Sequence, residues 1–162
     1  MTACKKYTFV DLFAGAGGFA EGFYQENFYA LSHIEFNKYA CDTLKSRMQF
    51  YNYQKDEIDS IIPVDMTQHN IFEIMNAQIK NREVDVIIGG PPCQSFSSQG
   101  KAKDKYGMQK DARNYLYESY MKVINYYKPK FFVFENVEGI LSTKINGKIL
   151  IEKIFSDMKK NY

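Results

Sequence analysis

Short apolar runs alternate with helix-like stretches along most of this chain. The runs have the composition of buried strands and span 7–13, 29–35, 61–65, 84–89 and 130–136. The helix-like stretches place apolar residues at helical spacing and span about 19–26, 38–48, 71–80, 116–127 and 149–159. This alternation predicts an α/β fold in which helices cover both faces of a parallel sheet. Right-handed crossovers are expected between its strands.

Composition limits the class of protein. The chain has 162 residues, 45% hydrophobic and 25% charged, as in one ordinary globular domain. Its net charge of +2 is too small to prove an anionic partner. No apolar segment of a signal peptide follows Lys5 and Lys6, and no run approaches the ~18 residues of a membrane span. Cys4, Cys41 and Cys93 form no C-x-x-C pair. We therefore expect a reduced, cytoplasmic protein without a membrane segment.

The unusual residues of the chain lie at the ends of the predicted strands or directly after them. In order along the chain they are the glycine-rich stretch 15–18, Glu35, Asp65, the segment 91–93 and Glu135. Ligands of open α/β sheets bind at the carboxyl ends of the strands. The sequence therefore predicts that these residues come together in one site.

The glycines resemble a nucleotide-binding turn. Gly15, Gly17 and Ala20 match the pattern G-x-G-x-x-G/A, and Glu35 lies near the place of a ribose-binding acid. Glycines there let the backbone turn tightly and approach a ligand closely. The pattern does not separate a nicotinamide dinucleotide from another adenosine-bearing ligand, and a plain tight turn is the alternative. Asp65 could accept from an adenine amino group, or serve only in a turn or near a helix N-cap.

The thiol of Cys93 follows two prolines, in the segment GGPPCQSFS (89–97). Pro91 and Pro92 stiffen the chain that leaves the strand, which favours a cysteine at the rim of the sheet. A cysteine at such a strand end is a candidate nucleophile. A lone cysteine is more often a small buried residue, but the prolines and Glu135, one strand away, favour the nucleophile.

Several segments together resemble a known family. DLFAGAGGF (11–19), GGPPCQSFS (89–97) and FENV (134–137) resemble the first, fourth and sixth motifs of cytosine carbon-5 methyltransferases, in the same order and spacing. Glu35 and Asp65 fall where the second and third motifs lie, and DARNYL (111–116) resembles the fifth. Amino-methylating relatives carry an Asp/Asn-Pro-Pro-aromatic motif instead, so Cys93 indicates carbon methylation.

The resemblance implies a fold, a cofactor and residue roles. The implied fold is the Rossmann-like parallel sheet of S-adenosylmethionine-dependent methyltransferases, truncated after about the fifth strand. Cys93 would add to carbon 6 of cytosine, while Glu135 would hydrogen-bond or protonate the ring at N3 and its exocyclic amine. The implied residues for S-adenosylmethionine are Phe13, Ala14, Gly15, Gly17, Gly18, Glu35, Asp65, Met66, Pro92 and Leu116. No metal is expected.

The stretch 95–113 is polar, glycine-bearing and rich in lysine. A duplex hides its bases, so chemistry on cytosine requires the base to be flipped out, and a loop that closes over it would suit this composition. We expect contacts with double-stranded DNA from Ser97, Gln99, Lys101 and Arg113. For any single lysine, a solvated surface loop is an equal interpretation.

Residues 1–162 are expected to form an incomplete catalytic and cofactor-binding domain. The family's arginine-bearing eighth motif, target-recognition domain and two further strands have no counterpart in the sequence, so the isolated chain is expected to be inactive. The run 130–136 would then be an edge strand, although it has the pattern of a strand covered on both faces. It would pair with a complementary C-terminal polypeptide or with a second copy.

The favoured function is a DNA (cytosine-5-)-methyltransferase of a bacterial restriction-modification system. A transfer-RNA cytosine-5 methyltransferase, and an inactive fragment or subunit of a split enzyme, remain as alternatives. A NAD-dependent oxidoreductase rests on the glycines alone and leaves Cys93 and Glu135 unexplained.

Overall fold

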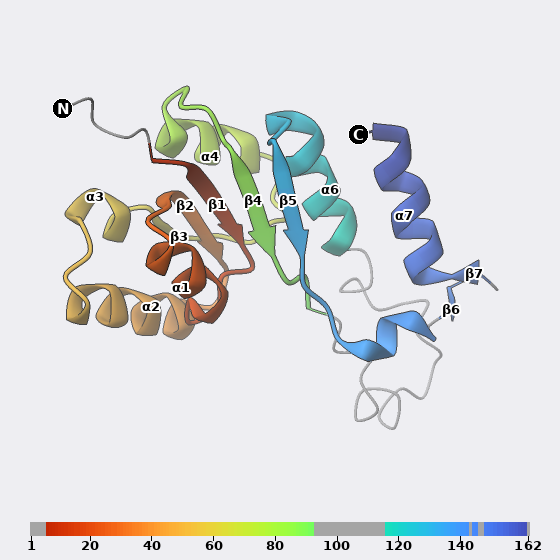
Figure 1. The fold of residues 1–162 in the computed structure, drawn as a ribbon, viewed down its shortest axis with the longest axis horizontal. Helices are drawn as coiled ribbons and strands as arrows, with labels where there is room; N and C mark the ends of the chain where they lie inside the picture. The colour runs from red at the N-terminus through yellow and green to blue at the C-terminus, as the bar shows by residue number, and fades with distance from the viewer. Residues whose placement is uncertain (1–5, 93–115, 143, 146–147, 162) are drawn as a thin grey trace.

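Strands and helices alternate in the computed structural model, which describes residues 6–92, 116–142, 144–145 and 148–161 (Figure 1). The strands of the main sheet are β1 (Thr8–Leu12), β2 (Tyr29–Glu35), β3 (Ile61–Pro63), β4 (Val86–Gly89) and β5 (Phe131–Phe134). The helices are α1 (Gly18–Gln25), α2 (Lys38–Phe50), α3 (Lys55–Ile58), α4 (Ile71–Ile79), α6 (Leu116–Tyr127) and α7 (Leu150–Asn161). A 3-10 helix (Glu138–Leu141) and a hairpin of β6 (Lys144–Ile145) and β7 (Lys148–Ile149) follow β5.

The main sheet has the order β3-β2-β1-β4-β5, and each neighbouring pair is parallel. The chain moves outward from β1 through β2 to β3, and then crosses to β4 on the other side of β1. Such a reversal leaves a crevice at the carboxyl ends of the central strands, where α/β proteins bind their ligands. The predicted α/β class and parallel sheet are confirmed.

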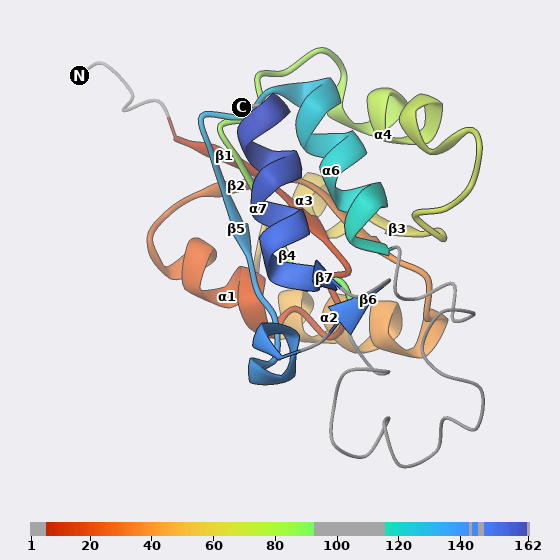
Figure 2. The same ribbon diagram turned by 90° about the vertical axis from the view of Figure 1, so that its right-hand side faces the viewer.

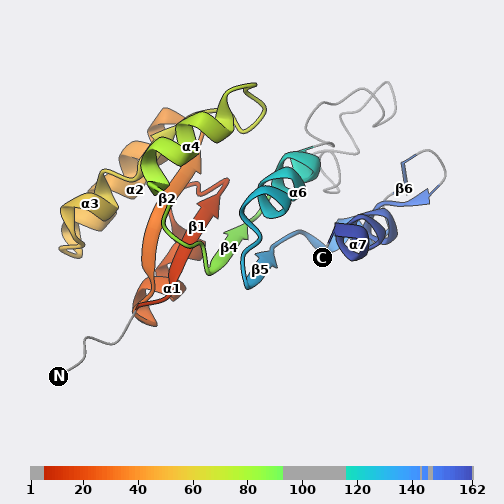
Figure 3. The same ribbon diagram turned by 90° about the horizontal axis from the view of Figure 1, so that it is seen from above.

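Helices lie on both sides of the sheet (Figures 2 and 3). On one side, α4 and α6 pack on the largest core cluster, which includes Leu12, Leu31 and Ile87. On the other side, α1 covers Phe9 and Ile88 with its aromatic residues. Helix α2 buries a smaller cluster with the turn after β1. None of the described helices is long and apolar enough to cross a membrane.

The predicted boundaries agree best where apolar spacing is regular. The strand 29–35 and the helix 116–127 match β2 and α6, whereas β1, β3, β4 and β5 are shorter than expected. Strand β1 ends before Phe13 because this residue has a φ of 59°, which a strand does not accommodate. The sequence analysis did not predict α3, the 3-10 helix or the β6–β7 hairpin, all of which are short.

Strand β5 lies at an edge of the sheet within the described residues, as predicted. Its coverage differs from the expectation. Phe132 and Phe134 pack against the main core, and the Phe134 ring meets Tyr120 of α6 at 5.2 Å. On the other face, Phe131 is 71% exposed and Val133 is 42% exposed. Within the described residues, β5 is therefore covered on one face only, although its sequence is apolar on both faces.

Candidate active site

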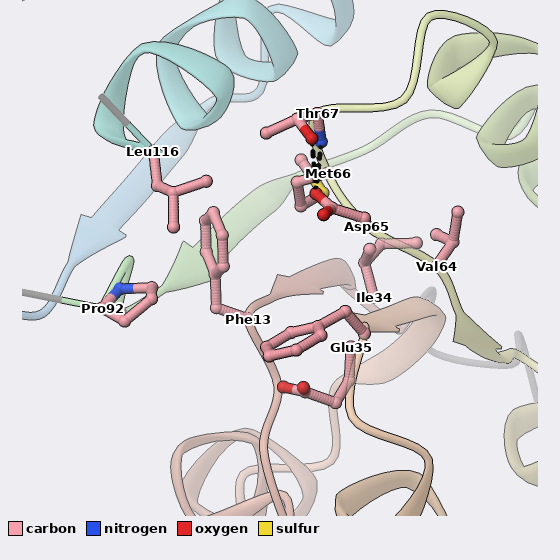
Figure 4. A pocket seen from close by; sticks show the side chains of 11 residues that line it. Phe13, Ile34, Glu35, Val64, Asp65, Met66, Thr67, Pro92 and Leu116 are labelled. Atoms are coloured by element: carbon pink, nitrogen blue, oxygen red, sulfur yellow. Dashed lines mark hydrogen bonds between the residues drawn. The ribbon is translucent and has the colours of Figure 1, made fainter. Parts of the chain in front are cut away.

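A cavity of about 500 Å³ opens at the carboxyl ends of β1 to β4 (Figure 4). It is lined by Phe13, Ile34, Glu35, Phe36, Val64, Asp65, Met66, Thr67, Gly90, Pro92 and Leu116. Its volume is within the range of small-molecule sites. Six of the predicted cofactor residues thus lie around one cavity, namely Phe13, Glu35, Asp65, Met66, Pro92 and Leu116. Figure 4 shows the Phe13 ring between Leu116 and Pro92 on one side and Asp65 on the other.

Glu35 is fixed at the end of β2 by two backbone donors. Its Oε2 atom accepts from the Gly15 N–H at 2.8 Å, and its Oε1 atom accepts from the Asn37 N–H at 2.7 Å. The side chain is buried, with 8% exposed. A carboxylate oxygen can accept more than one hydrogen bond. Both oxygens are therefore held in place and keep the capacity to accept from ligand hydroxyl groups.

Asp65 follows β3 and forms the second acidic side of the cavity. Its Oδ1 atom accepts from both the N–H and the hydroxyl of Thr67, each at 2.8 Å. This local turn orients the carboxylate, which lies next to buried Met66. Two carboxylates on neighbouring strands can thus accept hydrogen bonds from different parts of one ligand.

The remaining glycine-turn residues lie outside the cavity lining. Ala14 is buried, and its N–H donates to the carbonyl of Ile34 at 3.0 Å, which joins the turn to β2. Gly15 and Gly17 have positive φ, and a Cβ at Gly17 would overlap the Leu44 side chain. Gly18 begins α1. The structure therefore gives these residues a backbone role beside the cavity.

Sequence reasoning missed five of the lining residues, namely Ile34, Phe36, Val64, Thr67 and Gly90. Phe36 is the most informative, because it is 69% exposed although aromatic. An aromatic residue directly after the acid at the end of β2 was the available signal. The apolar lining residues Ile34 and Val64 resemble ordinary core residues in the sequence.

Glu135 lies beside the segment that leads to Cys93. Its N–H donates to the carbonyl of Gly89 at 3.0 Å. A Cβ at Gly90 would lie 2.5 Å from Oε2 of Glu135, so glycine makes room for this carboxylate. The predicted residues Cys93, Ser97, Gln99, Lys101 and Arg113 lie outside the described residues.

A buried polar chain lies beneath the site, between the sheet and α1. The Nδ1 atom of His33 lies 3.3 Å from Oδ2 of Asp11, and its Nε2 atom lies 2.8 Å from the hydroxyl of Tyr24. Burial raises the pKa of Asp11, and the contacts with His33 partly oppose this shift. These polar groups join β1, β2 and α1 behind Glu35. Among the described residues, no group of three or more His, Cys, Asp or Glu side chains could hold a metal ion.

The sheet order and the cavity define an α/β domain with a ligand site at the ends of its strands, and a solved methyltransferase shares this fold. The chain resembles a solved structure described as a DNA modification methyltransferase encoded within an E. coli prophage, with a TM-score of 0.70 and 29% identity over 96% of this chain and 38% of that chain. The S. pombe Dnmt2 methyltransferase shares the fold, with a TM-score of 0.57 and 16% identity over 94% of this chain and 41% of that chain.

Residues 7–161 match the C-5 cytosine-specific DNA methylases, and the chain belongs to this family. It is 33% identical to the type II methyltransferase M.Bpa9945I of Bacillus paralicheniformis, over 88% of this chain and 43% of the relative. It is 36% identical to M.DdeI of Desulfomicrobium norvegicum, over 94% of this chain and 33% of the relative. It is 37% identical to M.AquIA of Picosynechococcus, over 87% of this chain and 52% of the relative. The chain thus spans about a third to a half of these relatives.

Proposed function

We propose that the chain is the catalytic and cofactor-binding part of a DNA (cytosine-5-)-methyltransferase of a bacterial restriction-modification system, acting in the cytoplasm. Its family membership supports this proposal. The observation that carries the mechanism is the position of Glu135 against Gly90, just before the Pro-Pro-Cys segment. This contact brings a carboxylate to the strand end from which the proposed nucleophile follows.

The volume and the lining of the cavity support S-adenosylmethionine as the cofactor. Glu35 would accept from the ribose hydroxyls, and Asp65, one strand further out, from the adenine amine. Phe13 and Leu116 would pack against the adenine, with Pro92 and Met66 completing the wall. The glycine turn would lie against the methionine part, where α1 begins without a side-chain cap. The N–H groups of an uncapped helix start favour a carboxylate. When bound, this cofactor would supply an electrophilic methyl group.

The chain's own groups would make cytosine carbon 5 reactive. The thiolate of Cys93 forms a bond to carbon 6, and electron density moves to carbon 5, which can then take the methyl group. Glu135 holds N3 and the exocyclic amine and so stabilises the ring as the thiolate adds. Loss of the proton from carbon 5 breaks the sulfur–carbon bond and restores the aromatic ring. Ser97, Gln99, Lys101 and Arg113 are proposed to contact the DNA around the flipped base.

Trapping with 5-fluorocytosine tests this function. Fluorine at carbon 5 cannot leave as a proton does, so Cys93 should remain bonded to DNA containing this base. The assay should include a polypeptide that supplies the remaining length found in the relatives. We expect a covalent complex on a denaturing gel, and its complete loss in Cys93→Ser. Cys41→Ser is the matched control, since Cys41 is buried at 6% exposure and should leave the adduct intact. An adduct of normal yield in Cys93→Ser would refute the assignment.

We further propose that β5 pairs with an additional strand, from a complementary C-terminal polypeptide or from a second copy. Its position at the end of the strand order among the described residues and the exposed side chains of Phe131 and Val133 support this. Exposed apolar edges are otherwise prone to association. Light scattering should show self-association of the chain alone, which Phe131→Lys should reduce. A monomeric wild-type chain that methylates DNA at a defined sequence would contradict this proposal.

A further inference from the structure

The turn between β1 and α1 needs external support. Phe13, Gly15 and Gly17 have φ values of 59°, 55° and 81°. This left-handed region is uncommon for a bulky residue such as Phe13 and persists only where the surroundings fix it. The first half of the turn is fixed by β2, through the bonds that Ile34 and Glu35 accept. The second half is fixed from α2.

Both polar groups of the peptide bond between Ala16 and Gly17 are hydrogen-bonded. The Gly17 N–H donates to the carbonyl of Ala14 at 2.9 Å. The Ala16 carbonyl accepts from Nη1 of Arg47 at 3.2 Å. Because glycine adopts both signs of φ, a peptide bond next to it can rotate when it is held at one group only. Arg47 therefore fixes the orientation of this peptide.

Arg47 is itself held between α1 and α2. Its Nη2 atom donates to Oε2 of Glu21 at 2.6 Å, and the Tyr53 hydroxyl donates to the same oxygen at 3.2 Å. The side chains of Arg47 and Glu21 are 26% and 22% exposed. A guanidinium group can serve two acceptors in fixed directions, whereas lysine presents one compact ammonium group. The Arg47 guanidinium group thus links the glycine-rich loop, through the Ala16 carbonyl, to Glu21 at the start of α1.

We propose that Arg47 is a positioning residue for the amino-acid end of S-adenosylmethionine. This inference rests on the proposed function, in which the turn 15–18 lies against the methionine part. While Arg47 holds the Ala16 carbonyl, the dipole of this peptide keeps one direction. Once released, the peptide can rotate and turn its carbonyl toward the cofactor carboxylate. The part of the site that would bind adenosine is built by Phe13, Glu35 and Asp65. The affinity for the adenosine part of the cofactor should therefore not depend on Arg47.

Calorimetry with three ligands separates the two ends of the cofactor. S-adenosylmethionine and S-adenosylhomocysteine carry the amino-acid part, and 5′-methylthioadenosine lacks it. Arg47→Met should weaken the first two by about fivefold to tenfold, as expected for loss of one hydrogen bond, and leave 5′-methylthioadenosine unchanged. Arg47→Lys should recover part of the loss. Arg82→Met is the matched control, because Arg82 donates to the carbonyls of Ile79 and Gln78 on α4 and should alter none of the affinities.

The same measurements can overturn the proposal. Unchanged S-adenosylmethionine affinity in Arg47→Met, or an equal loss for all three ligands, would show that Arg47 has no specific role at the amino-acid end. If Arg47→Met does not fold, Glu21→Gln is judged by the same criterion, with a smaller loss in the same pattern expected. A wild-type chain that binds none of the ligands would instead refute the proposed function, which is a distinguishable result.

Discussion

On the face of the sheet that α1 packs against, the central strands and the edge strand β5 differ in how far they are covered. On the α1 side, Phe9 of β1 and Ile88 of β4 are fully buried under the aromatic residues of α1. On the same side, Phe131 and Val133 of the neighbouring β5 are 71% and 42% exposed. Ile88 and Val133 are register partners in adjacent strands. Burial on this face therefore changes sharply across one strand spacing.

The contrast shows that helix coverage, rather than apolar composition, decides burial here. β4 and β5 are both apolar, and α6 packs on the opposite face of both. Within the described residues, β1, β2 and β4 are closed on the second face by α1, and β3 is closed by α2. The half of the sheet that builds the cavity proposed for the cofactor, the cofactor half, is thus supported by its own helices. The half that carries Glu135 presents an apolar face that is suited to a further contact.

The largest expected effect is the difference in stability loss between alanine variants of the register partners Ile88 and Val133. Ile88→Ala removes fully buried atoms and should lower the free energy of unfolding by about 2–5 kcal/mol. Val133→Ala should lower it by less than about 1 kcal/mol, because much of that side chain already meets water. Urea unfolding of the purified chain, at a dilution at which light scattering shows a monomer, would measure both. Equal losses would mean that β5 is covered in solution and that the contrast is wrong.

A second prediction compares carboxylates of the two halves. Glu35→Ala and Asp65→Ala should each weaken S-adenosylmethionine binding by about 1–3 kcal/mol, because a partly desolvated acceptor is lost. Glu135→Gln should leave this affinity unchanged, since Glu135 does not line the cavity. Calorimetry would test all three variants, with NAD as a comparison ligand that we expect not to bind. Normal affinity in both alanine variants would mean that the cavity has been assigned to the wrong ligand.

A third prediction concerns the link between the two halves. The hydroxyl of Tyr120 lies 3.0 Å from the carbonyl oxygen of Val133 in β5 and 3.3 Å from that of Ile87 in β4, so its one proton is shared between the two strands. Tyr120→Phe should lower the free energy of unfolding by about 1 kcal/mol. Tyr126→Phe is the control, because Tyr126 is 53% exposed and bonds to Asn76 at the surface. A larger loss in the control would argue against a role of Tyr120 in holding β5.

The sequence predicted the elements where spacing is regular and failed where tertiary contacts decide. The prediction of a strand at 29–35 was correct because this stretch is long and clearly bounded. The end of β1 was not predicted, because it depends on the positive φ of Phe13. The acids Glu35 and Asp65 were found because each ends a predicted strand. No sequence pattern identifies the Arg47–Glu21 pair, whose members are separated by 26 residues and meet only through folding. Likewise, the run in β5 cannot reveal which of its faces is covered.

The smallest expected effect concerns this ion pair in the cofactor half. The hydrogen bond from Arg47 lowers the pKa of Glu21 below its ordinary value of 4.5. A lowered pKa in the folded state adds stability that is present above the unfolded pKa and is lost as pH falls through the folded pKa. The free energy of unfolding of wild type should therefore exceed that of Glu21→Gln by about 1 kcal/mol or less near neutral pH. This difference should shrink on acidification below about pH 4.

Glu83→Gln provides the counterpart next to β5. Glu83 lies 3.1 Å from Lys130, but the two side chains are 55% and 48% exposed, about twice as exposed as Glu21 and Arg47. Exposed pairs contribute little, because water screens the charges. Urea unfolding at neutral and acidic pH should thus show a smaller difference from wild type for Glu83→Gln than for Glu21→Gln. If the Glu83 variant showed the larger pH-dependent difference, the ion pair that holds the glycine turn would not distinguish the cofactor half from the edge.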